Sequence, residues 1–249
     1  MNIGIYQSAA SLSALERWQD SVTQNIASSQ LPGYRKRTVD FGAQAAGQLQ
    51  TGSVSQQSAD TAQASIFPTA SNSINFLPGE AQPTGRELDV AIQGEGFFEV
   101  QAADGSHAYT RNGAFEIQPD STLTTSSGEK VLSESGSPIT LLPGGGPLVI
   151  NPDGSLMQNG ATLGKLAVQK FADNSALTPG PDGTFVPTAG TAAIPVEKPD
   201  VLQGYLESSN VSSMHEMVDL ITISRAYESN QKMISTVDQE MQKTLDALG

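Results

Sequence analysis

The chain has 249 residues, with 26 acidic and 13 basic side chains and no cysteine, and its formal net charge is −13. Residues 41–216 hold eighteen acidic and six basic side chains, so the middle of the chain has no basic face for nucleic-acid phosphates. The absence of cysteine excludes disulfides, thiolate zinc sites and cysteine nucleophiles, and the length allows one large domain or two modest ones.

Residues 1–41 predict a helix followed by a turn. Apolar side chains recur at heptad spacing along the helix, with Gln19 in one apolar slot. Pro32 and Gly33 end the helix because neither continues it well. The segment lacks the basic start and unbroken apolar run of a cleaved signal peptide, and no window of the chain is apolar enough to predict a membrane span. The heptad residues are Ile5, Leu12, Leu15, Val22 and Ile26.

Residues 42–65 predict a linker. They contain no lysine or arginine and almost no large apolar side chain, so they cannot bury enough surface to fold alone. We expect this segment to become ordered, if at all, in contact with a partner.

Residues 66–206 predict a β-rich domain. Short apolar runs with a period of two are separated by polar turns such as NPDGS and GPDGT. HAYTR (107–111) and AFEIQ (114–118) flank Asn-Gly, which predicts a tight hairpin. The chain is therefore expected to be α+β, with a mostly antiparallel β domain between two terminal helices.

Residues 207–249 predict a second long helix. Ser213 with Glu216 fits a capping box at its start. From there, steps of three and four residues define a mostly apolar row, interrupted by Ser224 and Gln231. Polar residues in such a row, Gln19 included, either set the register of the helices or simply face solvent. The apolar and aromatic members used below are Met217, Leu220, Tyr227, Ile234, Met241 and Leu245.

The two terminal helices carry matching seams, so the simplest partner for each is the other. Such a pair leaves apolar flanks such as Ile223 and Met233 uncovered, and those flanks predict contact with neighbouring subunits. The alternative is a helical pair that covers one sheet within a monomer.

Catalytic, cofactor and metal sites are not expected. His107 and His215 lie far apart, and the SGEK run at 127–130 lacks the partner motifs of an S-x-x-K nucleophile. The run DNSALTPGPDG (173–183) has oxygen ligands without EF-hand spacing. Acidic residues such as Glu87 and Asp89 are not accompanied by a base or an oxyanion donor, so an enzyme is disfavoured.

Three segments resemble the bacterial flagellar rod and hook proteins. RELDVAIQGEGFFEVQAADGSHAYTRNGAFEI (86–117) resembles their central motif, and LQGYLESSNVSSMHEMVDLITISRAYESNQKMIST (202–236) resembles their C-terminal motif. NIASSQLPGYRKR (25–37) resembles the end of their N-terminal helix, with Asn25 and Ala27 matching and Tyr34-Arg35 in place of Phe-Lys. Length favours a rod protein over hook protein, and the run 150–171 favours the proximal over the distal rod protein.

The resemblance implies a structural subunit of the basal-body rod. In that family the terminal helices form an axial coiled-coil layer of a hollow, torque-transmitting tube, and they fold on assembly. The implied partners are other rod proteins and the flagellar type III export apparatus, and the implied location is the rod in the periplasm, reached without a cleaved signal peptide. The heptad residues of both helices would form the assembly interface. An adhesin with a helical stalk, or a hydrolase using carboxylates, are the alternatives from other classes.

Overall fold

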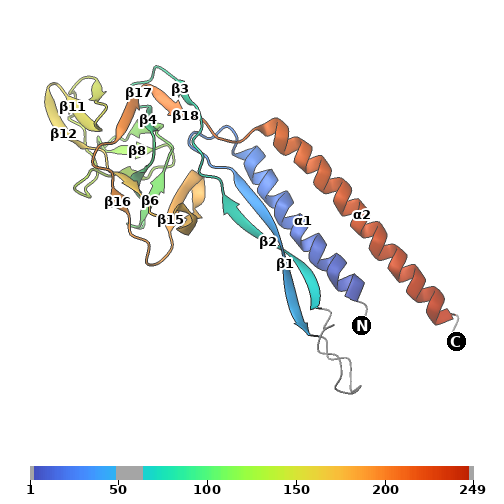
Figure 1. Ribbon diagram of the computed structural model, residues 1–249. Helices are drawn as coiled ribbons and strands as arrows, with labels where there is room; N and C mark the ends of the chain where they lie inside the picture. Colours follow the sequence, from blue (N-terminus) through green and yellow to red (C-terminus); the bar gives the residue numbers. More distant parts are fainter. Residues whose placement is uncertain (1–2, 49–63, 247–249) are drawn as a thin grey trace. The chain divides into compact units, whose positions relative to one another are not determined.

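The computed structural model describes residues 3–48 and 64–246, which form two compact units (Figure 1). Unit 1 consists of the residues up to Ala27, residues 37–73 and the chain from Ser212 onward. Unit 2 consists of residues 28–36 and 74–211. The predicted domains were continuous segments, whereas the two units are interleaved along the chain.

Unit 2 is built from short strands, and every pairing described between them is antiparallel, as predicted. The largest sheet has the order β14-β15-β6-β5-β9-β8-β7, and β13 joins it through β5 and also pairs with β16. Strands β10, β11 and β12 form a second sheet, and β17 pairs with β4 and β18 with β3. The strands are β3 (Ala81–Pro83), β4 (Val90–Gln93), β5 (Phe97–Gln101), β6 (His107–Thr110), β7 (Phe115–Ile117), β8 (Leu123–Thr125), β9 (Lys130–Val131), β10 (Leu148–Ile150), β11 (Ser155–Gln158), β12 (Ala161–Lys165), β13 (Val168–Lys170), β14 (Leu177–Pro179), β15 (Thr184–Pro187), β16 (Ile194–Pro195), β17 (Asp200–Gln203) and β18 (Tyr205–Glu207).

Two apolar cores lie on opposite faces of β5. Successive side chains of a strand point to opposite faces, so Phe97 and Phe98 enter different cores. Phe98 packs edge-on against Phe115, with ring centroids 5.2 Å apart, in the larger core. Phe97 packs against Phe185, with centroids 5.5 Å apart, in the smaller aromatic core. The alternation read from the sequence therefore produces a sheet that is buried on both sides at this strand.

The hairpin predicted at Asn112-Gly113 is wrong. Strand β6 pairs with β5 and β15, and β7 pairs with β8, so the two strands that flank Asn-Gly do not pair with each other. The Gly113 carbonyl instead accepts a hydrogen bond from the Val90 amide at 3.0 Å. A Cβ atom on Gly113 would lie 1.7 Å from the Val90 carbonyl oxygen. Glycine is needed here because another backbone passes against it, and not because of a hairpin turn.

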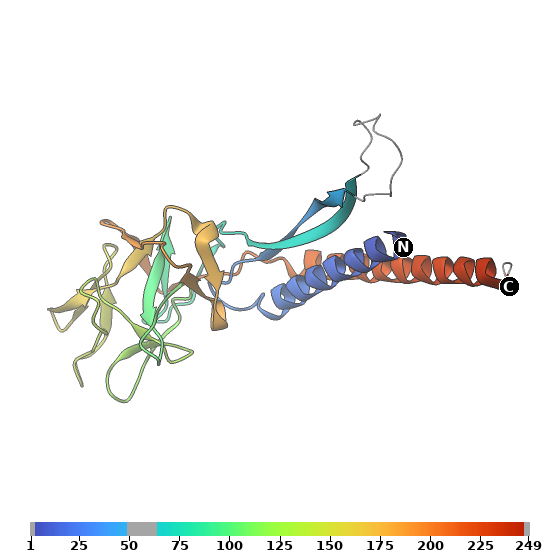
Figure 2. The ribbon, with the colours of Figure 1, turned by 90° about the horizontal axis from the view of Figure 1, so that it is seen from below.

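Unit 1 contains the two predicted helices, α1 (Ile3–Ala27) and α2 (Ser213–Asp246), and a two-stranded ribbon of β1 (Arg37–Gln48) and β2 (Ala64–Ile74). The helices run side by side in opposite directions, and the ribbon lies along α1 (Figures 1 and 2). The ring centroids of Trp18 and Phe41 are 5.6 Å apart, and Arg17 Nη1 donates to the Ala70 carbonyl at 2.9 Å. These contacts attach the ribbon to α1.

The predicted linker at 42–65 differs from the structure at both of its ends. Strand β1 continues to Gln48, and β2 begins at Ala64. Residues 49–63 lie outside the described part of the chain. Small polar residues supply little apolar surface, but their backbone groups pair as well as any others, and composition alone therefore did not reveal the ribbon.

Asn25 connects α1, β1 and α2 within unit 1. Its side-chain amide donates to the Arg37 carbonyl at 2.8 Å and to Glu216 Oε2 at 2.9 Å, and its Oδ1 accepts from the Arg37 amide at 2.8 Å. Asn25 and Glu216 are both fully buried. The Asn25 amide thus pairs with the first residue of β1 as a neighbouring strand would, while it holds the first turn of α2.

We expect Asn25→Ala to destabilise the protein by about 2–4 kcal/mol, because it removes three hydrogen bonds of a buried side chain, one of them to a buried carboxylate. Asn25→Asp keeps the shape but replaces the donor with an oxygen facing Glu216, and it should lose at least as much at neutral pH. Urea unfolding followed by circular dichroism at 222 nm measures both losses, with the exposed Gln19→Ala as the control. A loss within about 0.5 kcal/mol for Asn25→Ala, the range of ordinary surface changes, would contradict this role.

We expect Gly113→Ala to lose about 3 kcal/mol or more, since the new methyl group has no room beside Val90 and the backbone must shift. Gly105→Ala is the matched control, because a Cβ there meets no other atom within 4 Å although its φ is +85°. The control should lose only about 1–2 kcal/mol from conformational strain. Equal losses for the two variants in thermal unfolding would show that close approach is not the reason for Gly113.

Candidate assembly interface

One face of α2 packs against α1. Glu216 and Ile223 are fully buried on this face, and Leu220, Tyr227 and Ile234 are half-buried between and beyond them. These residues follow a heptad pattern that starts at Glu216 and includes Leu220. Near the other end of the pair, Ser8 Oγ lies 3.9 Å from Met233 Sδ, which confirms that the helices are antiparallel.

The predicted seam on α2 is rotated relative to the one observed. Leu220, Tyr227 and Ile234 belong to both seams, but Met217 is 54% exposed and does not face α1. The expectation that Ile223 is uncovered is wrong, since it lies at the centre of the buried face, whereas Met233 is indeed exposed. The rotation arises because Glu216 occupies a position in the observed seam. The predicted seam was chosen from apolar residues and therefore left Glu216 out.

On α1, Leu15 and Val22 are buried, and Leu12 and Ile26 are half-buried. Leu12 and Ile234 line a shallow groove of about 420 Å³ between the helices. The structure therefore brings together part of the predicted set from each helix. The side chains of Ile5, Met241 and Leu245 lie outside the described part.

The polar interruptions of the predicted seams face solvent. Gln19, Ser224 and Gln231 are exposed, and Ser224 Oγ donates to the Leu220 carbonyl of its own helix at 3.0 Å. The surface interpretation of these residues is therefore the better one. Asn25 and Glu216 form a buried polar contact between the helices. In the sequence, Asn25 was noted only as part of a family motif and Glu216 only as part of a capping box, and their contact was not predicted.

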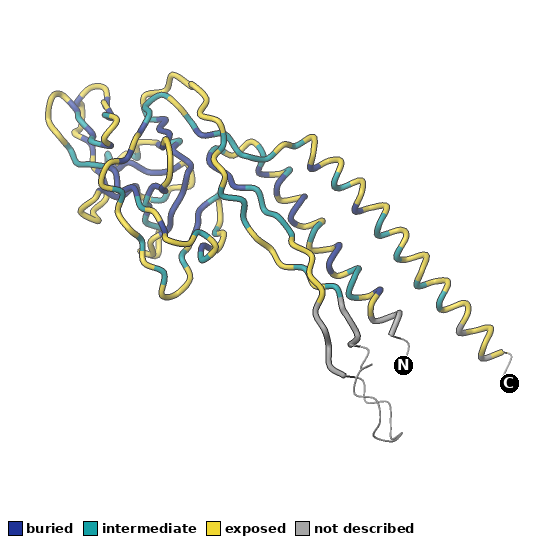
Figure 3. Tube along the Cα trace, viewed as in Figure 1, coloured by how far each residue is buried: buried dark blue, intermediate teal, exposed yellow. Residues whose placement is uncertain are grey.

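The opposite face of α2 carries an exposed apolar stripe over its first turns. At about 100° per residue, Met214, Val218 and Ile221 lie on the far side of the helix from Glu216 and Ile223, and Met217 lies on the flank beside them. Figure 3 shows the outer side of α2 exposed along its length. The exposed stripe was missed in the sequence, although its three- and four-residue spacing is a regular helical signal. Its members are Met214, Met217, Val218 and Ile221, and each has more than half of its surface exposed.

The two histidines noted in the sequence lie at the surface and are not part of a metal site in the described part of the chain. His107 Nδ1 lies 2.7 Å from Glu99 Oε1 at the surface, and His215 is exposed in the first turn of α2. In the described part of the chain, no group of three or more histidine or acidic residues is placed to hold a metal ion. None of the described helices is long and apolar enough to cross a membrane.

Several aspartates serve as turn caps. In each, the carboxylate accepts hydrogen bonds from the amide or hydroxyl of the residue two positions later, and these bonds lower its pKa. Asp153, in the NPDGS run, accepts from the Ser155 hydroxyl at 2.7 Å. Such acids stabilise turns and are not poised to accept protons near neutral pH. The group is Asp104, Asp120, Asp153 and Asp173.

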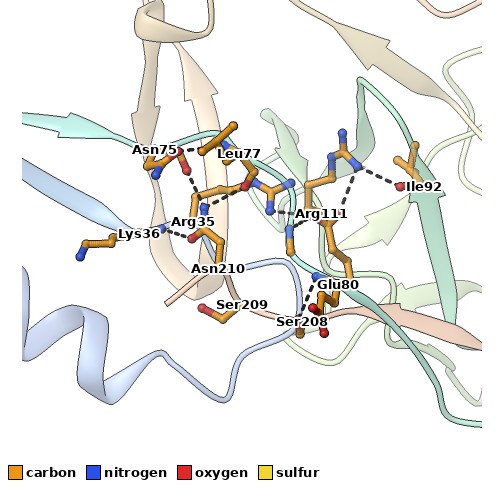
Figure 4. Close-up of polar contacts among 12 residues, drawn as sticks. Arg35, Lys36, Asn75, Leu77, Glu80, Ile92, Arg111, Ser208, Ser209 and Asn210 are labelled. Atoms are coloured by element: carbon orange, nitrogen blue, oxygen red, sulfur yellow. Dashed lines mark hydrogen bonds and ion pairs between the residues drawn. The ribbon is translucent and has the colours of Figure 1, made fainter. Parts of the chain in front are cut away.

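Unit 2 contains a buried ion cluster between distant segments. Arg35 Nη1 lies 2.6 Å from one carboxylate oxygen of Glu207, and Arg111 Nη1 lies 3.1 Å from the other. Beside it, Asn210 accepts from the Lys36 amide at 2.7 Å and donates to the Asn75 carbonyl at 2.9 Å (Figure 4). These contacts join the segment at 35–36 to the end of the β unit.

Two family models match the chain. The model of the flagellar basal body rod FlgEFG protein C-terminal region matches residues 202–247, and that of the flagellar hook protein FlgE/F/G D1 domain matches residues 91–158. The first therefore covers β18 and all of α2, and the second runs from β4 to the end of β11.

Curated relatives match over most of the chain. The flagellar basal-body rod protein FlgF of Caulobacter vibrioides is 37% identical over 70% of this chain and 71% of its own length. FlgF of Escherichia coli is 33% identical over 96% of this chain and 95% of its own. The flagellar basal-body rod protein FlgG of Agrobacterium fabrum is 39% identical over 65% of this chain and 64% of its own. With the terminal helices and the antiparallel β unit in place, the chain belongs to the flagellar basal-body rod protein family.

Proposed function

We propose that this protein is a structural subunit of the flagellar basal-body rod. Its terminal helices polymerise into a coiled-coil layer of a hollow, torque-transmitting axial tube. The names of its relatives support a rod subunit, and matches to FlgF proteins over nearly the whole chain favour the proximal rod. The FlgG relatives, which match about two thirds of the chain, make the distal rod the second candidate.

The observation that carries the proposal is that α2 is apolar on two opposite sides. One side is satisfied by α1, and the exposed stripe is not covered by any described residue of the chain. A helical tube requires heterologous contacts, in which one surface of a subunit meets a different surface of the next. A helix that packs within its own chain on one side and presents Val218 and Ile221 on the other has the two faces that such a layer needs.

The energies fit assembly on a template. Burying what remains exposed of the four stripe side chains, between 54% and 78% of each, supplies about 4–7 kcal/mol gross, at about 1.5–3 kcal/mol for a fully exposed side chain. Ordering the helices and losing the free motion of a subunit oppose most of this gain. We therefore propose that the protein stays monomeric in dilute solution and adds to a preformed end, where several neighbours cover it together.

The proposed interface combines the predicted heptad residues with the exposed stripe. Met217 belongs to both sets, and Leu12 and Ile234 contribute the groove that they line between the helices. We also propose that the flagellar type III export apparatus delivers the chain without cleavage and that it resides in the rod across the periplasm. The remaining members of the interface are Ile5, Leu15, Val22, Ile26, Leu220, Tyr227, Met241 and Leu245.

We expect the double variant Val218→Glu/Ile221→Glu to fold normally and to abolish swimming. Both side chains are exposed, so the isolated protein loses no packing, but the assembled layer would bury two unpaired carboxylates at a cost of several kcal/mol. The test replaces the native copy in the cell, measures spreading in soft agar and counts rods in purified basal bodies. Circular dichroism and sedimentation of the purified variant check its fold.

His215→Glu is the control, since it adds a negative charge in the same first turns at an exposed position outside the exposed stripe. It should swim. Normal swimming and intact rods in the double variant would reject assembly through this face. Loss of surface attachment with intact rods would instead favour the adhesin.

A further inference from the structure

A pocket of about 670 Å³ opens in unit 2 beside the buried ion cluster. The cluster guanidinium groups, Arg35 and Arg111, form part of its wall, and Phe76, Phe97 and Phe171 form an aromatic part. The exposed Leu77 also borders it. Its volume falls within the range of about 300–1,000 Å³ that is typical of ligand sites.

The buried cluster carries an excess positive charge. Arg35 and Arg111 are 2% and 5% exposed and share the single carboxylate of Glu207. Two exposed charges, Lys170 and Glu95, complete the set around the pocket and offset each other. Burial lowers the pKa of Arg111, and Glu207 opposes that effect, which indicates a guanidinium that is only partly compensated.

Donors of both arginines have no acceptor. The Nε atoms of Arg35 and Arg111 are buried and make no hydrogen bond to any described residue. The other nitrogens of Arg111 are occupied, with Nη1 donating to the Ile92 carbonyl at 3.1 Å and Nη2 to the Gly94 carbonyl at 2.5 Å. Figure 4 shows the hydrogen bond from the Arg111 side chain to Ile92. A buried N–H without an acceptor is costly, and these two donors add to the positive charge that Glu207 leaves uncompensated.

We propose that this pocket binds a glutamate or aspartate side chain presented by an extended segment of another protein chain. The carboxylate supplies the missing negative charge beside the two guanidinium groups, which form part of the pocket wall, and arginine is well suited to pair with a carboxylate. An aromatic or aliphatic residue beside the acid packs on the half-buried Phe76 and the exposed Leu77. The guanidinium carbon of Arg111 already lies 5.5 Å from the Phe97 ring centroid, so the charge and the apolar wall adjoin.

The walls favour a peptide over a small inorganic anion. Phosphate would leave the apolar surface of Phe76 and Leu77 in contact with water, whereas an acid with an apolar neighbour covers both parts of the pocket. In an assembled rod, an adjacent rod chain would supply the segment. The pocket itself does not depend on the terminal helices, because all of its lining residues belong to unit 2.

The test titrates the full-length ¹⁵N-labelled protein with the peptide Ac-Gly-Glu-Phe-Gly-NH₂ and follows the amide signals of Gly94 and Gly96. We expect saturable shifts at these two glycines, and at least about tenfold weaker binding of the glutamine counterpart, because glutamine lacks the negative charge that attracts the two guanidinium groups. Lys170→Glu should weaken binding about tenfold, and Glu95→Gln should strengthen it about threefold, since both side chains are exposed and change only the field at the pocket. Lys198→Glu, an exposed lysine that does not line the pocket, should leave the affinity unchanged.

Equal binding of the glutamate and glutamine peptides would overturn the proposal, and so would the absence of shifts up to about 10 mM peptide in a folded protein. Inorganic phosphate that binds as tightly as the peptide, with the same response to the variants, would show a general anion site and reject the peptide. These results concern unit 2 alone. Swimming of the stripe variant decides the rod function separately, so either idea can fail without the other.

Discussion

The packing of α2 against α1 through a buried polar contact determines how the rest of unit 1 is used. The Asn25 side chain forms hydrogen bonds with the Arg37 backbone and with Glu216. These bonds fix the end of α1, the start of β1 and the first turn of α2 relative to one another. Because Glu216 is fixed inward, the residues across the helix from it must face outward. The exposed stripe is thus a geometric consequence of which face carries the buried carboxylate.

Unit 2 folds from a sequence that is rich in glycine and short polar segments. Its strands are short, but Phe97 and Phe98 send adjacent side chains into two cores, and this gives one strand an apolar contact on both faces. The buried ion cluster joins two separate segments of the chain to β18, because Glu207 has a charged partner in each. Removing one partner of such a cluster is far more costly than the net stability that it provides.

The sequence predicted the existence and type of the major elements better than their contacts. Both helices and the antiparallel β unit are found where heptad and period-two patterns placed them. The helical seam was rotated because a polar residue, Glu216, occupies a core position, and only its partner Asn25 makes that position favourable. Asn112-Gly113 resembled a hairpin for a similar reason. Its glycine is required by a backbone 23 residues away in sequence, at Val90, and local patterns contain no information on such a neighbour. The exposed stripe, by contrast, was visible in the spacing and was missed because the apolar row chosen on α2 passed through one of its members.

The interleaved order of the segments also determines when unit 2 can finish folding. Gly33 donates to the Glu207 carbonyl at 2.7 Å, and Lys36 donates to Asn210 across 174 positions of sequence. Contacts between such distant segments form late and slow the folding rate, since the loop between them must close first. If the chain becomes available for folding from its N-terminal end, Arg35 has no ion-pair partner until Glu207, in β18, becomes available. The β unit cannot close as an independent early domain, and its completion follows the appearance of nearly the whole polypeptide.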